Sequence, residues 1–439
     1  MKKIRIFLLM GAVYLFSSEV LQVHGIDNEN FRNKQDGLSE RPFPILAWIG
    51  PPARLLTDVA WGDMAKAGFN LCNPLSFFDS VSNKKALVLG EKYGIGVLLR
   101  DPRFHYVGEP LEKSGIEEAV LQWMNEPAFA GYSVKDEPGA KDFNELARIK
   151  KIITAIDNSH RVYVNLFPDY ASDEQLGKLT YSKHVKSFMR KFRPGVLSYD
   201  YYSIIEEEEG TTIRSSYYEN MEIIRIAAIK AKVPFSTFTL SIPHWTYPTP
   251  TEGHMKFQLY SALAYGAKEL QYFTYGTVEN NPEFGDALID SAGNTTATYD
   301  LASKINWEIQ HMAPVLLDLE STDVFHTAPQ PSGTKAFNGY GGLTACSGGP
   351  AVLGFFDDSE GQKWLMVVNR NPFAPVTLTL TFAADIDSVG EVNKTTAGGI
   401  VNEVELVNQQ LILPLTSGDG RLFRIGTNSF SADHARGNL

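Results

Sequence analysis

Apolar runs of strand length alternate with amphipathic segments along most of this chain. About eight times, a short apolar run is followed by a segment in which apolar residues recur every three or four positions. The runs predict buried strands and the amphipathic segments predict helices. The predicted strands cover residues 44–50, 69–74, 96–102, 129–137, 161–166, 196–202, 233–240 and 269–275. The predicted helices lie near 58–67, 84–93, 116–125, 141–157, 183–192, 217–232, 254–267 and 299–317.

This alternation predicts parallel strands joined by right-handed crossovers. Eight such units match a closed (β/α)8 TIM barrel, which we expect over residues 41–322 as the catalytic domain. An open doubly wound sheet is the alternative. No glycine-rich phosphate loop follows the first predicted strand, which favours the barrel.

The pattern changes after about Asp323. Short apolar runs separated by turn residues replace the strand–helix rhythm, and no helical segment intervenes. This predicts a C-terminal antiparallel β-sandwich over 323–427, followed by a tail at 428–439. The runs cover 351–356, 364–368, 376–381, 404–407 and 410–413.

The N-terminus combines a basic start with an apolar run from Ile6 to Phe16. This pattern predicts a signal peptide over 1–25, followed by a polar tether over 26–40. A membrane anchor is the alternative, but the run is shorter than the roughly 20 residues that span a bilayer. We therefore expect a secreted or periplasmic protein with no membrane span.

Composition narrows the function classes. The net charge of −11 argues against binding to nucleic acid or to an anionic membrane surface. The nine histidines are scattered, and Cys72 and Cys346 have no metal-ligand spacing, so we expect no metal or other cofactor. These two cysteines are expected to be buried free thiols, with a disulfide as the alternative. The hydrolase and nucleotide-binding motifs His-Glu-x-x-His, Gly-x-Ser-x-Gly and Gly-x-x-x-x-Gly-Lys-Ser/Thr are missing.

The main candidate for chemistry is the acidic pair Asp136-Glu137, which ends the fourth predicted strand before Pro138-Gly139. In a (β/α)8 barrel, the carboxyl ends of the strands carry the active site. Cleavage of a glycosidic bond usually needs two carboxyl groups, one of them a proton donor. The structural alternatives are that Asp136 bonds loop amides and that Glu137 pairs with a nearby cation.

Other strand ends supply further candidates. Asp200 ends the sixth strand and is a candidate second carboxylate, with capping of loop amides as the alternative. The loop after the seventh strand carries His244 and Trp245, which predict either a sugar platform or a hydrophobic lid. We expect Glu137, Asp200 and Tyr275 at the same mouth of the barrel. The candidate substrate contacts are Trp48, Arg100, Asn165, Tyr199, Tyr202, His244, Trp245 and Tyr275.

These motifs resemble those of secreted bacterial (β/α)8 glycoside hydrolases. The similarity rests on 130–138, Leu197 to Tyr201, and the segment from Ala262 to Tyr275, and it covers about residues 41–320. It implies an enzyme that cleaves glycosidic bonds in an extracellular glycan. In the retaining glycosidases of clan A, the acid/base is a glutamate at the end of the fourth strand, a position that Glu137 matches.

The nucleophile of clan A is a glutamate at the end of the seventh strand, and this chain has no carboxylate there. The adjacent Asp136-Glu137 instead resembles the pair in hexosaminidase families 20 and 123. That resemblance implies that Asp136 orients a substrate acetamido group, which acts as the nucleophile. Tyr199-Asp200 is similar to the sixth-strand pair of family 18 chitinases, so Asp200 stays open as the partner. A catalytically inactive barrel that binds carbohydrate is the alternative function.

Overall fold

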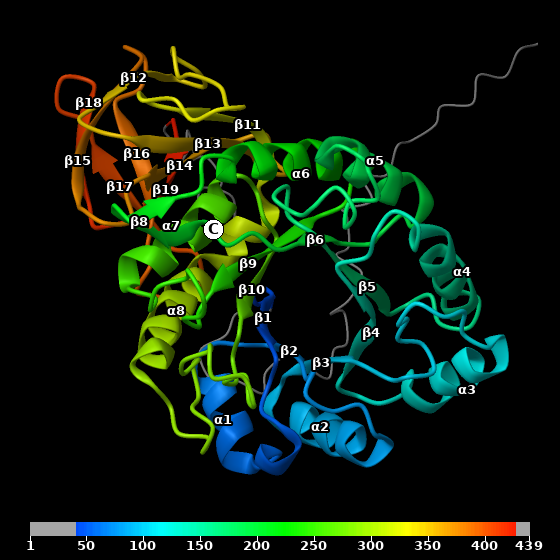
Figure 1. Ribbon diagram of the computed structural model, residues 1–439. Coiled ribbons are helices and arrows are strands. Elements are labelled where there is room, and N and C mark those ends of the chain that lie inside the picture. The colour runs from blue at the N-terminus through cyan, green and yellow to red at the C-terminus, as the bar shows by residue number, and fades with distance from the viewer. Residues whose placement is uncertain (1–40, 427–439) are drawn as a thin grey trace, which may run out of the picture.

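The computed structural model describes residues 41–426 (Figure 1). The predicted signal peptide (1–25), tether (26–40) and tail (428–439) lie outside the described residues. No helix within 41–426 has the length and apolar character needed to cross a membrane. Cys72 and Cys346 are free thiols, as expected, but only Cys72 is buried, and Cys346 is partly exposed.

Eight parallel strands close into a barrel, which confirms the predicted fold. Each barrel strand pairs with the barrel strand that follows it in the sequence, and β10 closes the ring against β1. The strands are β1 (Ile45–Trp48), β2 (Leu71–Asn73), β3 (Gly96–Leu99), β4 (Phe129–Asp136), β5 (Arg161–Leu166), β6 (Leu197–Tyr199), β9 (Phe235–Leu240) and β10 (Glu269–Phe273).

Helices surround this barrel, as Figure 1 shows, and several begin at a side-chain cap. The side chain of Thr57 accepts a hydrogen bond from the backbone of Ala60, and Asp79 caps the next long helix in the same way. The helices are α1 (Asp58–Lys66), α2 (Ser80–Tyr93), α3 (Lys113–Trp123), α4 (Phe143–Thr154), α5 (Tyr181–Lys191), α6 (Tyr217–Ala231), α7 (Glu252–Ala264) and α8 (Ala297–Asp318).

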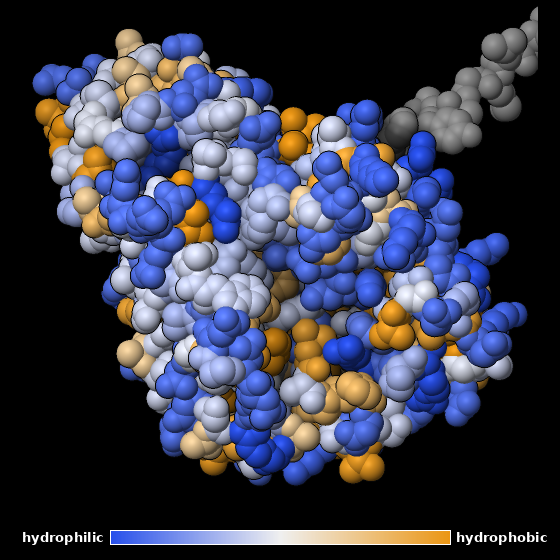
Figure 2. Space-filling view, viewed as in Figure 1, coloured by the Kyte–Doolittle hydropathy of each residue, from blue (hydrophilic) through white to orange (hydrophobic). Residues whose placement is uncertain are grey.

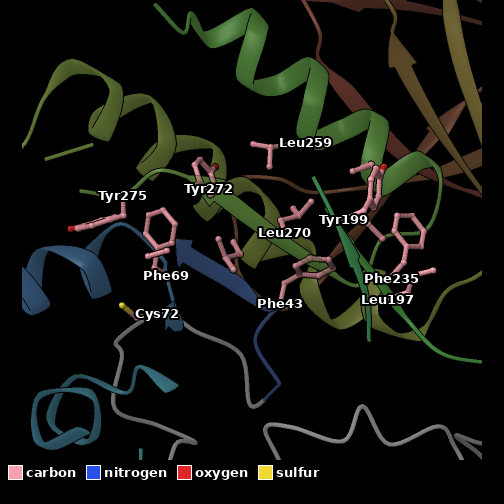
Figure 3. Packing of buried hydrophobic residues seen from close by; sticks show 14 of the residues in the cluster. Phe43, Phe69, Cys72, Leu197, Tyr199, Phe235, Leu259, Leu270, Tyr272 and Tyr275 are labelled. Atoms are coloured by element: carbon pink, nitrogen blue, oxygen red, sulfur yellow. The ribbon is translucent and has the colours of Figure 1, made fainter. Parts of the chain in front are cut away.

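Side chains alternate between two layers along each barrel strand. On β5, Val162 and Val164 join the large apolar layer between strands and helices, part of which is seen in Figure 3. Tyr163 instead packs inside the barrel with Leu46 and Phe238. The barrel interior also holds polar side chains, which become important at the site below.

The C-terminal part is a pair of antiparallel sheets that enclose a second apolar core, as predicted for a β-sandwich. The larger sheet contains β11 (Glu320–His326), β13 (Ala351–Asp357), β14 (Lys363–Asn369), β19 (Gly420–Ile425), β16 (Ser388–Val392) and β17 (Val401–Glu405). The smaller sheet contains β12 (Leu343–Ser347), β15 (Val376–Phe382) and β18 (Gln410–Leu415).

Helix α7 lies between the barrel and the larger sheet, where it packs on β9 and on β13, β14 and β19. Every residue from Gly253 to Ala264 is buried, because both faces of this helix are covered by protein. Figure 2 shows the surface of the molecule from the same side as Figure 1. This surface is largely hydrophilic, with apolar side chains in scattered groups.

A small hairpin follows β6 and was not predicted. It consists of β7 (Ile204–Glu207) and β8 (Gly210–Ile213), and its exposed tip carries four consecutive glutamates, residues 206–209. Ile204 and Ile205 at its base are buried, which anchors the hairpin on the barrel. The hairpin therefore forms part of the barrel mouth.

Candidate active site

A cavity of about 260 Å³ opens at the carboxyl ends of the barrel strands. It combines three carboxyl groups with a largely aromatic wall. Its lining residues are Trp48, Asp136, Glu137, Asn165, Pro168, Tyr170, Asp200, Tyr202, Phe238, His244, Trp245, Tyr247, Phe273 and Phe284.

The backbone turns at Glu137, so that two adjacent carboxylates reach one cavity. On a regular strand, Asp136 and Glu137 would face opposite sides. Glu137 instead has φ of 46°, a conformation uncommon for residues other than glycine. Its backbone N–H donates to the carbonyl oxygen of Asn165 at 2.9 Å, which holds the turn against β5.

Asn165 ties carboxylates of two strands together. Its Nδ2 donates to Oδ1 of Asp136 at 3.2 Å and to Oδ1 of Asp200 at 2.9 Å. Its own Oδ1 accepts a hydrogen bond from Ser198 Oγ at 2.9 Å, which fixes the orientation of the amide. Asn165 is therefore a positioning residue for this pair.

A column of hydrogen bonds supports Asn165 from inside the barrel. Tyr163 donates its hydroxyl to Oε1 of Gln271 at 2.7 Å, and Nε2 of Gln271 donates to Ser198 Oγ at 2.8 Å. These buried bonds leave Ser198 little freedom to turn away from Asn165. From the cavity inward, the column contains Ser198, Tyr163, Gln271, Ser236, Glu269 and Arg161.

The environment raises the pKa of all three carboxyl groups. Burial, followed by the charge of Asp136, raises the pKa of Glu137 to about 7, against the effect of a hydrogen bond with Asp200. Burial raises the pKa of Asp200 well above its ordinary value, and the charges of Glu137 and Asp136 add to this rise.

Asp136 differs from the other two carboxyl groups. Protein atoms crowd it and raise its pKa to about 6, while the hydrogen bond from Asn165 opposes this rise. Its side chain nevertheless borders the open cavity and counts as exposed, so water there also favours the charged form. We therefore assign the negative charge of the cluster at neutral pH first to Asp136.

Aromatic rings form the remaining walls. Trp48 meets Phe238 edge-on at 5.1 Å between ring centroids, and His244 stacks on Phe284 at 4.4 Å. Trp245 stands at the rim, 64% exposed, and its Nε1 donates to Glu283 at 2.5 Å. Flat apolar walls with polar groups at one end suit a ligand that has an apolar face and hydroxyl edges.

The structure gathers most of the predicted contacts in this cavity and separates three from it. The residues that line it are Trp48, Asn165, Tyr202, His244 and Trp245. Arg100 lies outside, with its guanidinium 5.4 Å from the Phe78 ring, although its charge still acts on Asp136.

Tyr199 and Tyr275 differ from the expected role in substrate contact. Both are fully buried in the layer between strands and helices, and Tyr275 packs on Phe69 at 5.4 Å (Figure 3). Tyr199 faces outward because the residues on either side of it, Ser198 and Asp200, face inward. Tyr275 follows β10 at the mouth, and there its backbone, rather than its ring, approaches β1.

Sequence reasoning missed Phe238, Phe273, Phe284, Pro168 and Tyr170 as lining residues. Phe238 had a detectable signal, since it alternates with threonines on a predicted strand and shares a face with Ser236. Phe284 lies in a long loop with no periodicity, so its position depends on tertiary packing. No cluster of His, Cys, Asp and Glu within 41–426 could hold a metal ion.

Similar structures share this fold. A protein described as "Glycoside hydrolase" superposes on 88% of this chain and 93% of its own, with a TM-score of 0.57 and 11% identity. A glycoside hydrolase family 5 protein from Bacteroides vulgatus ATCC 8482 has a TM-score of 0.52 and 11% identity, covering 89% and 90%. A family 39 glycoside hydrolase from the gut symbiont Bacteroides cellulosilyticus WH2 has a TM-score of 0.50 and 12% identity, covering 88% and 81%.

No family model matches the sequence, and no curated protein matches it either. The chain therefore shares its (β/α)8 barrel fold with solved structures of glycoside hydrolases. At 11–12% identity, this likeness shows the fold alone and extends neither to an activity nor to a substrate.

Proposed function

We propose that this protein is a glycoside hydrolase with Glu137 as its general acid. The proposal rests on the carboxyl group of Glu137, which lies in an aromatic cavity and has its pKa raised to about 7. Such a group keeps its proton in a large fraction of molecules at neutral pH and gives it up readily. Transfer of this proton to the glycosidic oxygen allows the bond between that oxygen and the anomeric carbon to break.

Asp136 is the better partner for Glu137 in this proposal. Asp200 resists ionisation, because burial and its two acidic neighbours raise its pKa, and a carboxyl group that keeps its proton can neither attack carbon nor act as a base. Asp136 ionises most readily and faces the cavity. Its carboxylate can accept the N–H of a 2-acetamido group, whose carbonyl oxygen then attacks the anomeric carbon. This attack forms a cyclic oxazolinium ion. Water then attacks its anomeric carbon, breaks the bond to the acetamido oxygen and gives a proton back to the Glu137 carboxylate.

The residues after β9 support a mechanism in which the substrate itself supplies the nucleophile. The residue after this strand is Ser241, whose hydroxyl donates to the carbonyl oxygen of Thr274 at 2.9 Å. No carboxylate follows between Ser241 and Tyr247, so the position of the clan A nucleophile is filled by other groups. Asp200 remains the alternative partner, as base or nucleophile, if it loses its proton on substrate binding.

We also propose an extracellular or periplasmic glycan as the substrate. This part rests on the signal-peptide pattern of residues 1–25 and on the aromatic walls of the cavity. The missing carboxylate after β9 also favours a second candidate function, a catalytically inactive barrel that binds carbohydrate in the same cavity.

Glu137→Gln tests the acid assignment. We expect kcat to fall by about 100-fold or more on substrates with poor leaving groups, because these need the proton. Activated aryl glycosides should lose much less. Each substrate is assayed as a 2-acetamido and a 2-hydroxy version, and only the acetamido version should be cleaved if the substrate supplies the nucleophile.

Glu208→Gln, in the exposed turn of the β7–β8 hairpin, removes the same charge outside the cavity and serves as the control. Equal losses on poor and activated leaving groups would contradict the acid role of Glu137. Binding of glycans without hydrolysis of any of them would favour the inactive carbohydrate-binding barrel.

A further inference from the structure

A second hollow of about 350 Å³ lies beside the catalytic cavity, between the β7–β8 hairpin and the start of α6. Tyr170 lines both spaces. The volume of this hollow is in the range of small-molecule sites, about 300–1,000 Å³. It is lined by Tyr170, Tyr201, Ile205, Glu207, Thr212, Ile213, Arg214, Ser215 and Ser216.

Arg214 is the distinctive group of this hollow. Its guanidinium carbon lies 4.5 Å from the ring centre of Tyr170 and 5.8 Å from that of Tyr247. Its Nε donates to the backbone oxygen of Tyr202 at 3.2 Å, and its Nη2 donates to the Tyr247 hydroxyl at 3.3 Å. A guanidinium carries five N–H donors, so these two bonds leave several for a ligand.

The charge of Arg214 has no carboxylate partner at salt-bridge distance among residues 41–426. Partly buried arginines are usually paired with an anion, because neutral partners compensate poorly for lost hydration. Glu207 lines the hollow but belongs to the exposed part of the hairpin. Asp169 does not line the hollow and accepts a hydrogen bond from Ser216. Burial raises the pKa of Asp169 to about 6, and the charge of Arg214 opposes this rise, although the two side chains form no salt bridge.

Arg214 is also connected to the catalytic cavity. The two groups that accept its hydrogen bonds belong to Tyr202 and Tyr247, and both residues line that cavity. A glycan that places one sugar ring among the catalytic carboxylates can therefore place a neighbouring ring over Arg214. The planar fork of a guanidinium binds carboxylate and sulfate groups through two parallel hydrogen bonds.

We propose that this hollow is a subsite for a sugar unit that carries a carboxylate or a sulfate. The proposal rests on the proposed glycoside hydrolase function and narrows its substrate to acidic glycans. The anionic ring lies in the hollow, away from the three carboxylates, while a neutral neighbouring ring lies in the catalytic cavity.

Binding measurements test this subsite without requiring hydrolysis. Titration calorimetry uses the full chain with Glu137→Gln, alone and combined with Arg214→Gln or Arg214→Lys. The probes are matched oligosaccharides that are neutral, carboxylated or sulfated. Arg190→Gln removes an exposed arginine on α5 and is the charge-matched control.

We expect Arg214→Gln to weaken binding of one or both acidic probes by about 10-fold or more, and to affect the neutral probe much less. Arg214→Lys should retain part of the affinity, since it keeps the charge but loses the fork. Affinity for the acidic probe should fall as salt rises. The comparison of the two acidic probes decides between carboxylate and sulfate.

Equal affinity of Arg214→Gln and its parent for the acidic probes would overturn the subsite, and so would the absence of any preference for acidic over neutral probes. Thermal unfolding checks that each variant folds. If Arg214→Gln does not fold, the affinity of Arg214→Lys and the salt dependence of binding still decide whether the hollow is a subsite for an anionic sugar. Arg214-dependent binding by a protein that hydrolyses no glycan would remove the proposed enzymatic function and keep the subsite.

Discussion

At the scale of single residues, the three carboxyl groups show how environment rather than residue type sets chemistry. Asp136, Glu137 and Asp200 are ordinary acids in the sequence, yet each has a raised pKa in the folded protein. Burial disfavours the charged form of each one. Neighbouring carboxylates add to the rise for Glu137 and Asp200, whereas the charges of Lys135 and Arg100 oppose it for Asp136. Asn165 moderates this by donating to both aspartates. The cluster therefore holds protons that isolated carboxylates would release.

This proton binding predicts a pH-dependent stability. The pKa of Glu137 rises from 4.5 to about 7 on folding, so the folded protein binds this proton more tightly than the unfolded chain. Its contribution to stability is fully present below pH 4.5 and is lost as the pH rises toward 7. At pH 8, we expect Glu137→Gln to unfold at a higher temperature than the wild type, by roughly 2 °C or more.

At pH 4 the same two proteins should unfold at nearly the same temperature, since both side chains are then neutral. Calorimetry at the two pH values measures this directly and needs no substrate. Glu208→Gln should show no difference at either pH. A difference between Glu137→Gln and wild type that stays constant across this range would contradict the raised pKa.

At the scale of elements, the close approach of α7 and β13 depends on a residue without a side chain. A Cβ on Gly354 would lie 2.0 Å from the carbonyl oxygen of Ala264, the last residue of α7. Two backbones cannot pack this closely with any larger residue between them. Gly354 therefore sets the distance between the helix and the larger sheet.

Gly354→Ala should lower the free energy of unfolding by about 1–3 kcal/mol, because backbone must shift to admit the methyl group. Chemical denaturation measures the loss. Gly195→Ala is the matched control, since a Cβ there meets nothing within 4 Å, and its effect should stay within about 0.5 kcal/mol. Equal effects of the two substitutions would mean that the helix and sheet can separate at no cost.

At the scale of the whole molecule, buried charges join the barrel to the β-sandwich. Lys256 on α7 is 5% exposed and lies 3.0 Å from Glu252, 3.5 Å from Glu308 and 3.5 Å from Asp419. Lys394 of the sandwich reaches the same Glu308 and Asp419. Barrel and sandwich thus share one ion cluster, and we expect them to unfold together.

Lys256→Gln should lower the free energy of unfolding by about 2 kcal/mol while a single transition remains, because it leaves partly buried carboxylates with less compensation. Lys304 also contacts Glu252, but its side chain is 56% exposed, so Lys304→Gln should cost at most about 1 kcal/mol. Calorimetry of both variants tests this difference. Two separate transitions would show that the cluster does not couple the parts.

The sequence by itself determined the order and type of nearly all barrel elements. Strand and helix periods differ, so the run at 161–166 and the segment at 217–232 were predicted within a residue of β5 and α6. The sandwich was harder, and β11, β12, β16 and β19 went unpredicted. Their mixed burial, as in β11, gives only a weak apolar run, because their stability comes from pairing with distant strands.

The candidate site divides in the same way. Glu137, Asp136 and Asp200 could be found from sequence, because parallel strands bring their carboxyl ends to one mouth. Only the tertiary structure decided that Asn165 would hold two aspartates, that Tyr199 and Tyr275 would face the helices, and that Arg214 would lie beside the cavity. Those facts depend on side-chain direction and on contacts between residues distant in sequence. A local pattern carries neither, because each partner is brought into place by the folding of the whole chain.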